Sequence, residues 1–301
     1  MAKHMEETQD THQAGFVNII GKPNVGKSTL LNALMGEKLA ITTYKAQTTR
    51  HRIMGIYSEE NYQIIFSDTP GAIAPKYELH KAMMSYVNEA LEDADIILFM
   101  VEVEDKSVSD VLIEKLRKLS VPILLLINKV DLTTPPVLEE ATAYWQAQLP
   151  KAELFPIAAL HQLGVGEVFN RILALLPVHP PFFDKEQLTD RTERFIAAEV
   201  IREKIFLNYK EEIPYSSEVQ ITYFKEEGDT LHIRAEIMVE RESQKGILIG
   251  KKGLALKKVG TEARKDLEQF FRKKVFLEQH VKVEKDWRKQ KKKLARFGYN
   301  N

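Results

Sequence analysis

The sequence contains no cysteine, which excludes disulfide bonds and cysteine-ligated zinc sites and suits a reducing cytosol. Long hydrophobic runs are also absent: the longest two, 96–101 and 122–127, are far shorter than the roughly 20 residues of a membrane-spanning helix. The stretch 1–14 lacks the apolar core of a secretion signal, and its acidic residues argue against a transit peptide. We therefore expect residues 1–14 to form a disordered tail.

The chain also has no net charge, because 43 lysines and arginines balance 43 aspartates and glutamates. This balance conceals an asymmetry. Residues 1–180 carry 16 basic against 22 acidic side chains, whereas residues 241–301 carry 19 against 7. A cationic field focused on one segment is expected of a surface that binds nucleic acid or an acidic membrane. A solvated charged helix with a disordered basic tail would have the same composition.

Apolar runs alternate with helical patterns through the first 176 residues. Strands are predicted at 16–20, 52–57, 62–67, 96–103, 122–128 and 154–157, and helices at 27–35, 107–119, 137–148 and 165–176. The second and third strands form a predicted hairpin around a polar turn. The alternation predicts a doubly wound α/β sheet, in which ligands bind beyond the carboxyl ends of the strands.

The proline-rich string PVHPPFFD at 177–184 interrupts this pattern, because three prolines cannot continue the preceding helix and favour an extended link. Beyond it we predict helices at 192–209 and 254–270, a short helix before residue 250, and strands at 217–224, 231–239 and 275–283. The change of pattern indicates a second domain of the α+β class.

The string GKPNVGKST at 21–29 matches the phosphate-loop pattern GxxxxGK(S/T) between a predicted strand and a predicted helix. Gly21 and Gly26 allow the backbone to approach phosphates, Lys27 reaches the β- and γ-phosphates, and the Ser28 hydroxyl ligates Mg²⁺. The predicted nucleotide contacts of this loop are Gly21, Lys22, Pro23, Asn24, Val25, Gly26, Lys27, Ser28 and Thr29. In this position a plain glycine turn is a weak alternative.

The string DTPG at 68–71 follows another predicted strand. Asp68 is expected to hold Mg²⁺ through a water molecule, and the Gly71 N–H to sense the γ-phosphate. The predicted contacts of this string are Asp68, Thr69, Pro70 and Gly71. Thr48 and Thr49 are both candidates for the hydroxyl that ligates Mg²⁺ in the GTP state. We favour Thr49, and for Thr48 an exposed loop threonine is an equal alternative.

The string NKVD at 128–131 predicts recognition of guanine. The Asp131 carboxylate can accept hydrogen bonds from guanine N1–H and N2–H₂, whereas adenine presents an acceptor at N1. A buried acceptor left unpaired costs about 1–3 kcal/mol, so the string selects GTP over ATP. The far wall of the base pocket is expected at 158–160, where the Ala159 N–H can bond guanine O6. The predicted base contacts are Asn128, Lys129, Asp131, Ala158, Ala159 and Leu160.

The glutamine that orients water in Ras-like switches is missing, because Ala72 and Ile73 follow Gly71. Unaided hydrolysis is therefore expected to be slow. A bound monovalent cation can neutralise charge between the phosphates, and the Asn24 carbonyl suits such an ion. The predicted catalytic residues are Asn24, Lys27, Thr49 and Gly71. The alternative is a non-enzymatic RNA-binding scaffold that only holds GTP.

The string GKKG at 250–253 lies between two predicted helices, the arrangement in which a GxxG loop of a KH domain clamps roughly four nucleotides. Elsewhere such a string is mostly a turn, so the prediction depends on this position and on the surrounding positive charge. The predicted RNA contacts are Ile247, Ile249, Gly250, Lys251, Lys252, Gly253, Leu254, Lys257 and Lys258. Trp287 is a candidate for stacking on a base, although a lone aromatic more often packs in a core.

These strings together resemble the Era family of bacterial GTPases over nearly the whole chain. The resemblance rests on GKPNVGKSTLLN, KAQTTR at 45–50, DTPG, NKVD, FIAAEVIREK at 195–204, EIPYS at 212–216 and VERESQKGILIGKKG at 239–253. It implies a Ras-like GTPase domain at 15–177, a linker at 178–190, a type II KH domain at 191–290 and a basic tail at 291–301. Ala158 departs from the usual serine and Ala72 from a larger apolar residue.

The resemblance also implies partners and a location. It implies binding to the single-stranded 3′ end of 16S ribosomal RNA and to the 30S subunit, with a role in assembly and maturation of that subunit. It further implies Mg²⁺, K⁺ at Asn24, a monomer, and a cytoplasmic protein partly associated with the inner membrane. A membrane-surface device controlled by GTP is the remaining alternative for the basic segment.

Overall fold

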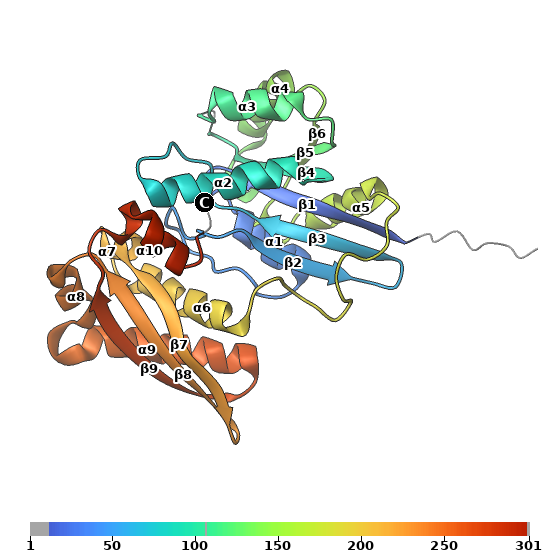
Figure 1. The fold of residues 1–301 in the computed structure, drawn as a ribbon. Coiled ribbons are helices and arrows are strands. Elements are labelled where there is room, and N and C mark those ends of the chain that lie inside the picture. The colour runs from blue at the N-terminus through green and yellow to red at the C-terminus, as the bar shows by residue number, and fades with distance from the viewer. Residues whose placement is uncertain (1–11, 106, 300–301) are drawn as a thin grey trace, which may run out of the picture. The chain divides into compact units, whose positions relative to one another are not determined.

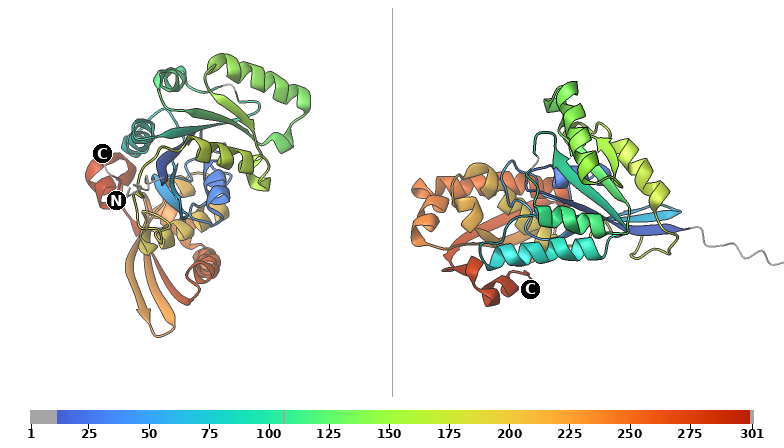
Figure 2. Two further views of the ribbon diagram at one scale, coloured as in Figure 1. Left: turned by 90° about the vertical axis from the view of Figure 1, so that its right-hand side faces the viewer. Right: turned by 90° about the horizontal axis from the view of Figure 1, so that it is seen from above.

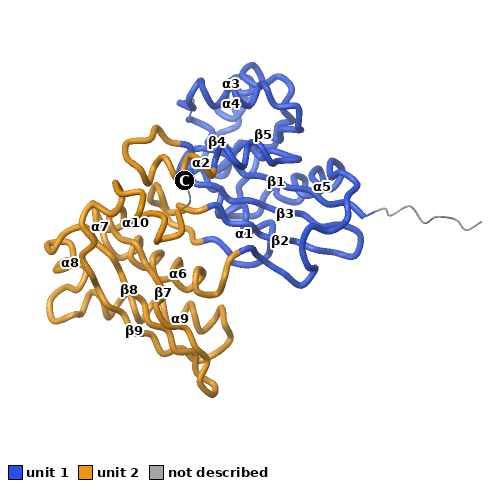
Figure 3. The backbone as a smooth tube through the Cα atoms, viewed as in Figure 1, with its two compact units in different colours: residues 1–40, 52–72, 87–190 blue, residues 41–51, 73–86, 191–301 orange. Residues whose placement is uncertain are grey.

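The computed structural model describes residues 12–105 and 107–299, and these form two compact units (Figure 3). The first unit comprises the described residues up to 40 together with 52–72 and 87–190. The second comprises 41–51, 73–86 and the described residues from 191 onward. Two segments that the sequence places inside the GTPase domain, 41–51 and 73–86, thus belong to the second unit.

The first unit is built on a six-stranded sheet in the order β2-β3-β1-β4-β5-β6 (Figure 1). Its strands are β1 (Gln13–Gly21), β2 (Ile53–Ser58), β3 (Tyr62–Asp68), β4 (Ile96–Glu102), β5 (Ile123–Asn128) and β6 (Glu153–Pro156). All neighbours are parallel except β2 and β3, which form the predicted hairpin. The predicted α/β class is therefore confirmed.

Strand β1 begins inside the stretch 1–14 that the sequence assigns to a tail. Gln13 and Ala14 pair with Tyr62 and Gln63 of β3, which supplies backbone partners that a tail would lack. The rest of that predicted tail, residues 1–11, lies outside the described residues.

Helices cover both faces of the six-stranded sheet (Figure 2). They are α1 (Lys27–Met35), α2 (Glu78–Glu92), α3 (Asp110–Lys118), α4 (Pro135–Gln148) and α5 (Val165–Leu175). Helix α2, whose first half is counted with the second unit, was not predicted. Its signal was available, because Leu79, Ala82, Met83, Tyr86 and Val87 follow helical spacing and are all buried.

The predicted linker 178–190 contains bends and a turn and belongs to the first unit. Backbone N–H groups of Phe182 and Phe183 donate to the Gln63 Oε1 at 2.8 and 3.0 Å. The N–H of Ile56 in β2 donates to the Leu188 carbonyl at 2.9 Å. These bonds hold the proline-rich segment along the sheet edge.

The second unit contains a three-stranded sheet in the order β7-β8-β9. Its elements from residue 191 onward are α6 (Glu193–Asn208), α7 (Ile213–Ser216), β7 (Glu218–Glu227), β8 (Thr230–Val239), α8 (Glu242–Ile249), α9 (Leu254–Phe271), β9 (Lys274–Val283) and α10 (Lys291–Arg296). Helices α6 and α9 pack against each other and against the sheet. Along β8, Leu231, Ile233, Ala235, Ile237 and Val239 are buried in the core of this unit.

The end of the chain, predicted as a basic tail at 291–301, is folded through residue 299. Leu294, Phe297 and Tyr299 are buried in an apolar cluster with the first half of α2. Trp287 lies in the same cluster, fully buried, and its indole N–H donates to the Ser216 carbonyl at 2.9 Å. Trp287 is therefore a packing residue and is not exposed for stacking on a base. Across residues 12–105 and 107–299, no helix has the length and apolar character needed to cross a membrane.

Candidate functional site

The predicted phosphate loop connects β1 to α1 at the carboxyl end of the sheet. Gly26, the residue before α1, has φ +102°, a backbone conformation that favours glycine. A Cβ atom at Gly26 would lie 2.4 Å from Asn128 Nδ2, and one at Gly21 would lie 2.3 Å from the Met100 carbonyl oxygen. Both glycines are therefore required by close approach of other chain segments.

Lys27 is folded back over the loop that precedes it. Its Nζ donates to the carbonyls of Lys22, at 2.7 Å, and Gly21, at 3.2 Å. Burial lowers the pKa of Lys27 to about 8, although the Asp68 carboxylate acts in the opposite direction. The ammonium group thus lies where loop N–H groups and the helix N-terminus create an anion site.

The side chain of Asn128, in the NKVD string, bonds to both the phosphate loop and the segment 158–160. Its Nδ2 donates to the Val25 carbonyl of the phosphate loop at 2.7 Å, and its Oδ1 accepts from the Ala159 N–H at 2.9 Å. The Ala158 N–H donates to the Leu163 carbonyl at 3.0 Å, which closes the loop that contains residues 158–160. The structure therefore brings NKVD and the segment 158–160 to the phosphate loop, with Ala158 and Ala159 buried and the Leu160 side chain exposed.

Two side chains outside the predicted site lie beside the NKVD string. Glu102, the last residue of β4, forms an ion pair with Lys129. His161 Nε2 lies 3.5 Å from Asp131 Oδ2. For Glu102 the available signal was an acidic residue that ends an apolar strand.

The DTPG string packs directly on the phosphate loop. The Ala72 N–H donates to the Gly21 carbonyl at 3.0 Å, and a Cβ atom at Gly71 would lie 2.5 Å from Pro23. The Ser28 hydroxyl donates to Asp68 Oδ2 at 2.5 Å. A hydroxyl and one carboxylate are the oxygen ligands that Mg²⁺ takes beside nucleotide phosphates, so these residues fit that ion.

No cluster of three or more histidine, aspartate or glutamate side chains that could hold a metal ion occurs in the described residues. A metal cage made of protein groups is thus not present in that part of the chain. A site completed by phosphates and water remains consistent with the geometry around Ser28.

Thr48 and Thr49, the candidates for the remaining Mg²⁺ ligand, are buried and belong to the second unit. The Thr48 hydroxyl donates to the Lys45 carbonyl at 2.7 Å, and the Thr48 carbonyl accepts from Arg202 of α6. The segment is therefore described together with α6, as part of the second unit.

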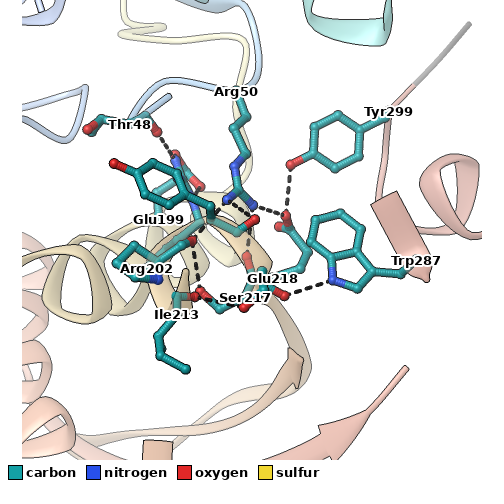
Figure 4. A network of polar contacts seen from close by, with 12 residues as sticks. Thr48, Arg50, Glu199, Arg202, Ile213, Ser217, Glu218, Trp287 and Tyr299 are labelled. Carbon is teal, nitrogen blue, oxygen red and sulfur yellow. Dashed lines mark hydrogen bonds and ion pairs between the residues drawn. The ribbon is translucent and has the colours of Figure 1, made fainter. Parts of the chain in front are cut away.

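Arg50 anchors the same segment through a buried polar network (Figure 4). Its guanidinium donates to the Ser217 carbonyl and the Glu218 carboxylate at 2.8 and 3.0 Å, and to two carbonyls of α7. The Tyr299 hydroxyl donates to the same carboxylate at 2.8 Å, and burial raises the Tyr299 pKa well above its ordinary value. The network joins the segment before β2 to α7, β7 and the end of the chain.

The predicted RNA clamp lies between α8 and α9, as the sequence indicated. Gly250 and Gly253 both have positive φ, +71° and +76°, and Lys251 and Lys252 between them are exposed. A Cβ atom at Gly250 would lie 2.6 Å from the Ala255 Cβ, so glycine is required there by contact as well as by conformation.

The side chains around the clamp divide into exposed and packed ones. Ile247 and Leu254 are 53% and 63% exposed, which is unusual for large apolar residues and suits a groove. Ile249 packs against the core of the unit. Lys257 is exposed, and Lys258 lies 3.8 Å from Glu262.

Comparison with known proteins identifies two families along the chain. A family described as 50S ribosome-binding GTPase matches residues 16–129, and the KH domain family matches residues 212–288. The GTPase Era of Geotalea uraniireducens (strain Rf4) is 45% identical, over 97% of this chain and 99% of that protein. The GTPase Era of Syntrophus aciditrophicus (strain SB) is 46% identical, over 96% and 95%.

Two crystal structures match the chain over 96% of its length, each with a TM-score of 0.92 and with all of the other chain covered. One is a variant of Aquifex aeolicus Era bound to GDP and AlF₄⁻, 38% identical. The other is Era in complex with MgGDPNP and nucleotides 1506–1542 of 16S ribosomal RNA, 40% identical.

Proposed function

Because the chain belongs to the Era family of GTPases, we propose that it is a GTP-hydrolysing switch whose nucleotide state sets the RNA affinity of its KH domain. Its RNA is the single-stranded 3′ end of 16S ribosomal RNA on the 30S subunit, where the protein acts as a monomer in subunit assembly and maturation. The relative solved with that RNA supports this assignment. The observation that carries the proposal is the Asn128 amide, which ties the phosphate loop to both base-recognition strings.

Guanine selection is assigned to the Asp131 carboxylate, with the Ala159 N–H directed at O6. We expect the intact protein to bind GTP well and ATP hardly, because adenine leaves the carboxylate without donors. Asp131→Asn should shift the preference toward xanthine nucleotides, measured by competition with a fluorescent guanine nucleotide. Equal binding of ATP and GTP by the unchanged protein contradicts the proposal.

The phosphates are assigned to the loop 21–29 and to Lys27, with Ser28, Asp68 and Thr49 as ligands or water-bridged partners of Mg²⁺. The bound ion supplies charge neutralisation on the β- and γ-phosphates. A bound phosphate should raise the pKa of Lys27 above about 8, because an anion beside the buried ammonium offsets the cost of its burial. The Gly71 N–H reports the presence of the γ-phosphate.

Hydrolysis is slow without help, because neither Ala72 nor Ile73 can orient water. The Asn24 side chain holds K⁺, which takes over part of the charge stabilisation. We expect turnover to rise in K⁺ relative to Na⁺ and to rise again with RNA, and Asn24→Ala to lose the K⁺ response. Turnover that stays undetectable under every combination favours the scaffold alternative.

The clamp 250–253 holds RNA through its backbone and through Lys251 and Lys252. Replacing both lysines by alanine should weaken RNA binding more than tenfold and reduce its salt dependence, while GTP affinity stays unchanged. Lys225→Ala, an exposed lysine of β7 that pairs with Glu227, is the matched control. RNA affinity unchanged in the double variant contradicts the placement of the clamp.

A cytoplasmic location with partial peripheral association with the inner membrane completes the proposal. The excess of basic residues in 241–301 supports attraction to anionic lipid. Sedimentation with anionic liposomes, with and without competing RNA, separates the two uses of this charge. Binding to lipid that RNA cannot displace would favour a membrane-surface device.

A further inference from the structure

Lys45, in the segment 41–51, holds the carboxyl end of helix α6. Its Nζ donates to the backbone carbonyls of Phe206 and Tyr209. Carbonyls in the last turn of a helix lack N–H partners within the helix, and a cation at that end also interacts favourably with the helix dipole. Lys45 therefore ties its loop to α6 at two backbone atoms.

Tyr209 continues this contact toward the clamp. Its hydroxyl donates to the Leu248 carbonyl at 2.5 Å, in the last turn of α8 and two residues before Gly250. Burial raises the pKa of Tyr209 to about 12, so the phenol is a proton donor at neutral pH. Because the Leu248 side chain is fully buried, the end of α8 is held from both its backbone and its core side.

Lys45 is also bonded to the residue that precedes the proposed Mg²⁺ ligand. The Thr48 hydroxyl donates to the Lys45 carbonyl at 2.7 Å and lies 2.5 Å from the Thr43 hydroxyl. These bonds make 43–48 one compact turn, and Thr49 follows it directly. Hydrogen bonds, together with short stretches of chain at either end, thus connect Thr49 to Gly250, the first glycine of the clamp.

We propose that Lys45 and Tyr209 are positioning residues that link the segment 41–51 to the RNA clamp at 250–253, an inference that rests on the proposed function. When Mg²⁺ and GTP draw Thr49 to the phosphates, the turn 43–48 carries Lys45 with it. The contacts of Lys45 with α6 then differ between the nucleotide states. A ligand shifts an equilibrium only through such a difference, and Tyr209 passes the shift to the last turn of α8.

The simpler role for both residues is capping of two helix ends. Capping alone would alter stability and RNA affinity to the same extent in both nucleotide states. The ratio of RNA affinities between the GTP-analogue and GDP states therefore distinguishes a link from a cap.

The test uses variants of the full chain that remove single groups. Tyr209→Phe deletes only the hydroxyl, and Tyr223→Phe is its matched control, since that hydroxyl bonds Glu227 on β7 at 2.9 Å. Lys45→Met deletes the ammonium, and Lys45→Arg retains a cation. The probe is a fluorescein-labelled single-stranded RNA with the 3′-end sequence of 16S ribosomal RNA, titrated in Mg²⁺ with GMPPNP or with GDP.

We expect the wild-type ratio of RNA affinities to differ from one. In Tyr209→Phe and Lys45→Met, the ratio of RNA affinities should move most of the way from the wild-type value to one. In the controls Tyr223→Phe and Lys45→Arg the ratio should keep its wild-type value, and in all four variants the affinity for GMPPNP should stay within twofold of wild type. An unchanged ratio in Tyr209→Phe and Lys45→Met, including equal loss of affinity in both states, overturns the link and leaves nucleotide control intact. A wild-type ratio of one overturns nucleotide control and the link together.

Discussion

Replacing Arg50 by methionine is expected to destabilise the second unit by about 3–5 kcal/mol. The Arg50 side chain is fully buried, and its guanidinium makes four hydrogen bonds, one of them to the Glu218 carboxylate at 3.0 Å. Methionine fills a similar volume without a donor, so a buried carboxylate loses its cation. Removal of one partner of a buried ion pair costs about 3–5 kcal/mol, a large part of the roughly 5–15 kcal/mol that stabilises a domain.

Urea unfolding followed by fluorescence measures this change in the second unit alone. The chain has two tryptophans, Trp145 in α4 and Trp287 in the second unit, so a Trp145→Phe background leaves one reporter. Arg50→Lys keeps the charge but loses the planar fork, and should cost less than Arg50→Met. Adding Glu218→Gln to Arg50→Met should recover part of the loss, because it removes the unpaired charge.

The size of the loss decides whether Arg50 is a true anchor. A decrease below about 1 kcal/mol for Arg50→Met is what one ordinary hydrogen bond contributes, and it would refute the reasoning from burial. A further loss on adding Glu218→Gln would also contradict it, since the two side chains would then stabilise the unit independently.

Three further predictions concern single positions. Gly26→Ala should reduce GTP affinity more than a hundredfold in a fluorescent nucleotide titration, whereas Gly36→Ala, also at positive φ but with no atom within 4 Å of its Cβ, should leave it nearly unchanged. Burial and three neighbouring arginines hold the pKa of His51 well below its ordinary value, so the unfolded chain binds a proton below about pH 6.5 that the folded chain does not. As the pH is lowered below that value, the free energy of unfolding should therefore decrease by up to about 1.4 kcal/mol per pH unit. In His51→Phe, urea unfolding should show no such contribution from this position. Gly250→Ala should lower RNA affinity more than tenfold and leave GTP affinity unchanged, because its Cβ would lie 2.6 Å from the Ala255 Cβ.

The nucleotide strings could be recognised from sequence because each determines its own local geometry. The full pattern GxxxxGK(S/T), placed between an apolar strand and a helix, indicates a phosphate loop from local sequence. What the sequence did not indicate is how the strings are joined. The Asn128 amide bonds Val25 and Ala159, which are 103 and 31 residues away, and no periodic pattern reports such a bond.

The segment 41–51 shows why tertiary contacts cannot be predicted from the sequence of one segment alone. Arg50 looks like a solvated charge at the end of a polar loop, yet its guanidinium is completely buried. An arginine can be buried only where several acceptors converge, and here they come from residues 214–218. The strings KAQTTR and EIPYS are both parts of the family resemblance, and the structure gives them one physical reason: they are hydrogen-bonded to each other.

The structure also reduces the number of basic side chains in 241–301 that are available to bind phosphate. Much of the basic excess in 241–301 is compensated locally, because Arg264, Lys273, Lys282, Arg288 and Lys293 each form an ion pair with a glutamate of the second unit. Within the described residues, Lys251, Lys252 and Lys257 have no such acidic partner, and all three are exposed at the clamp. A charge already paired gains little from a phosphate, since it must first lose its carboxylate. The salt dependence of RNA binding should therefore reflect fewer phosphate contacts than the full excess of 12 positive charges, with Lys251, Lys252 and Lys257 among them.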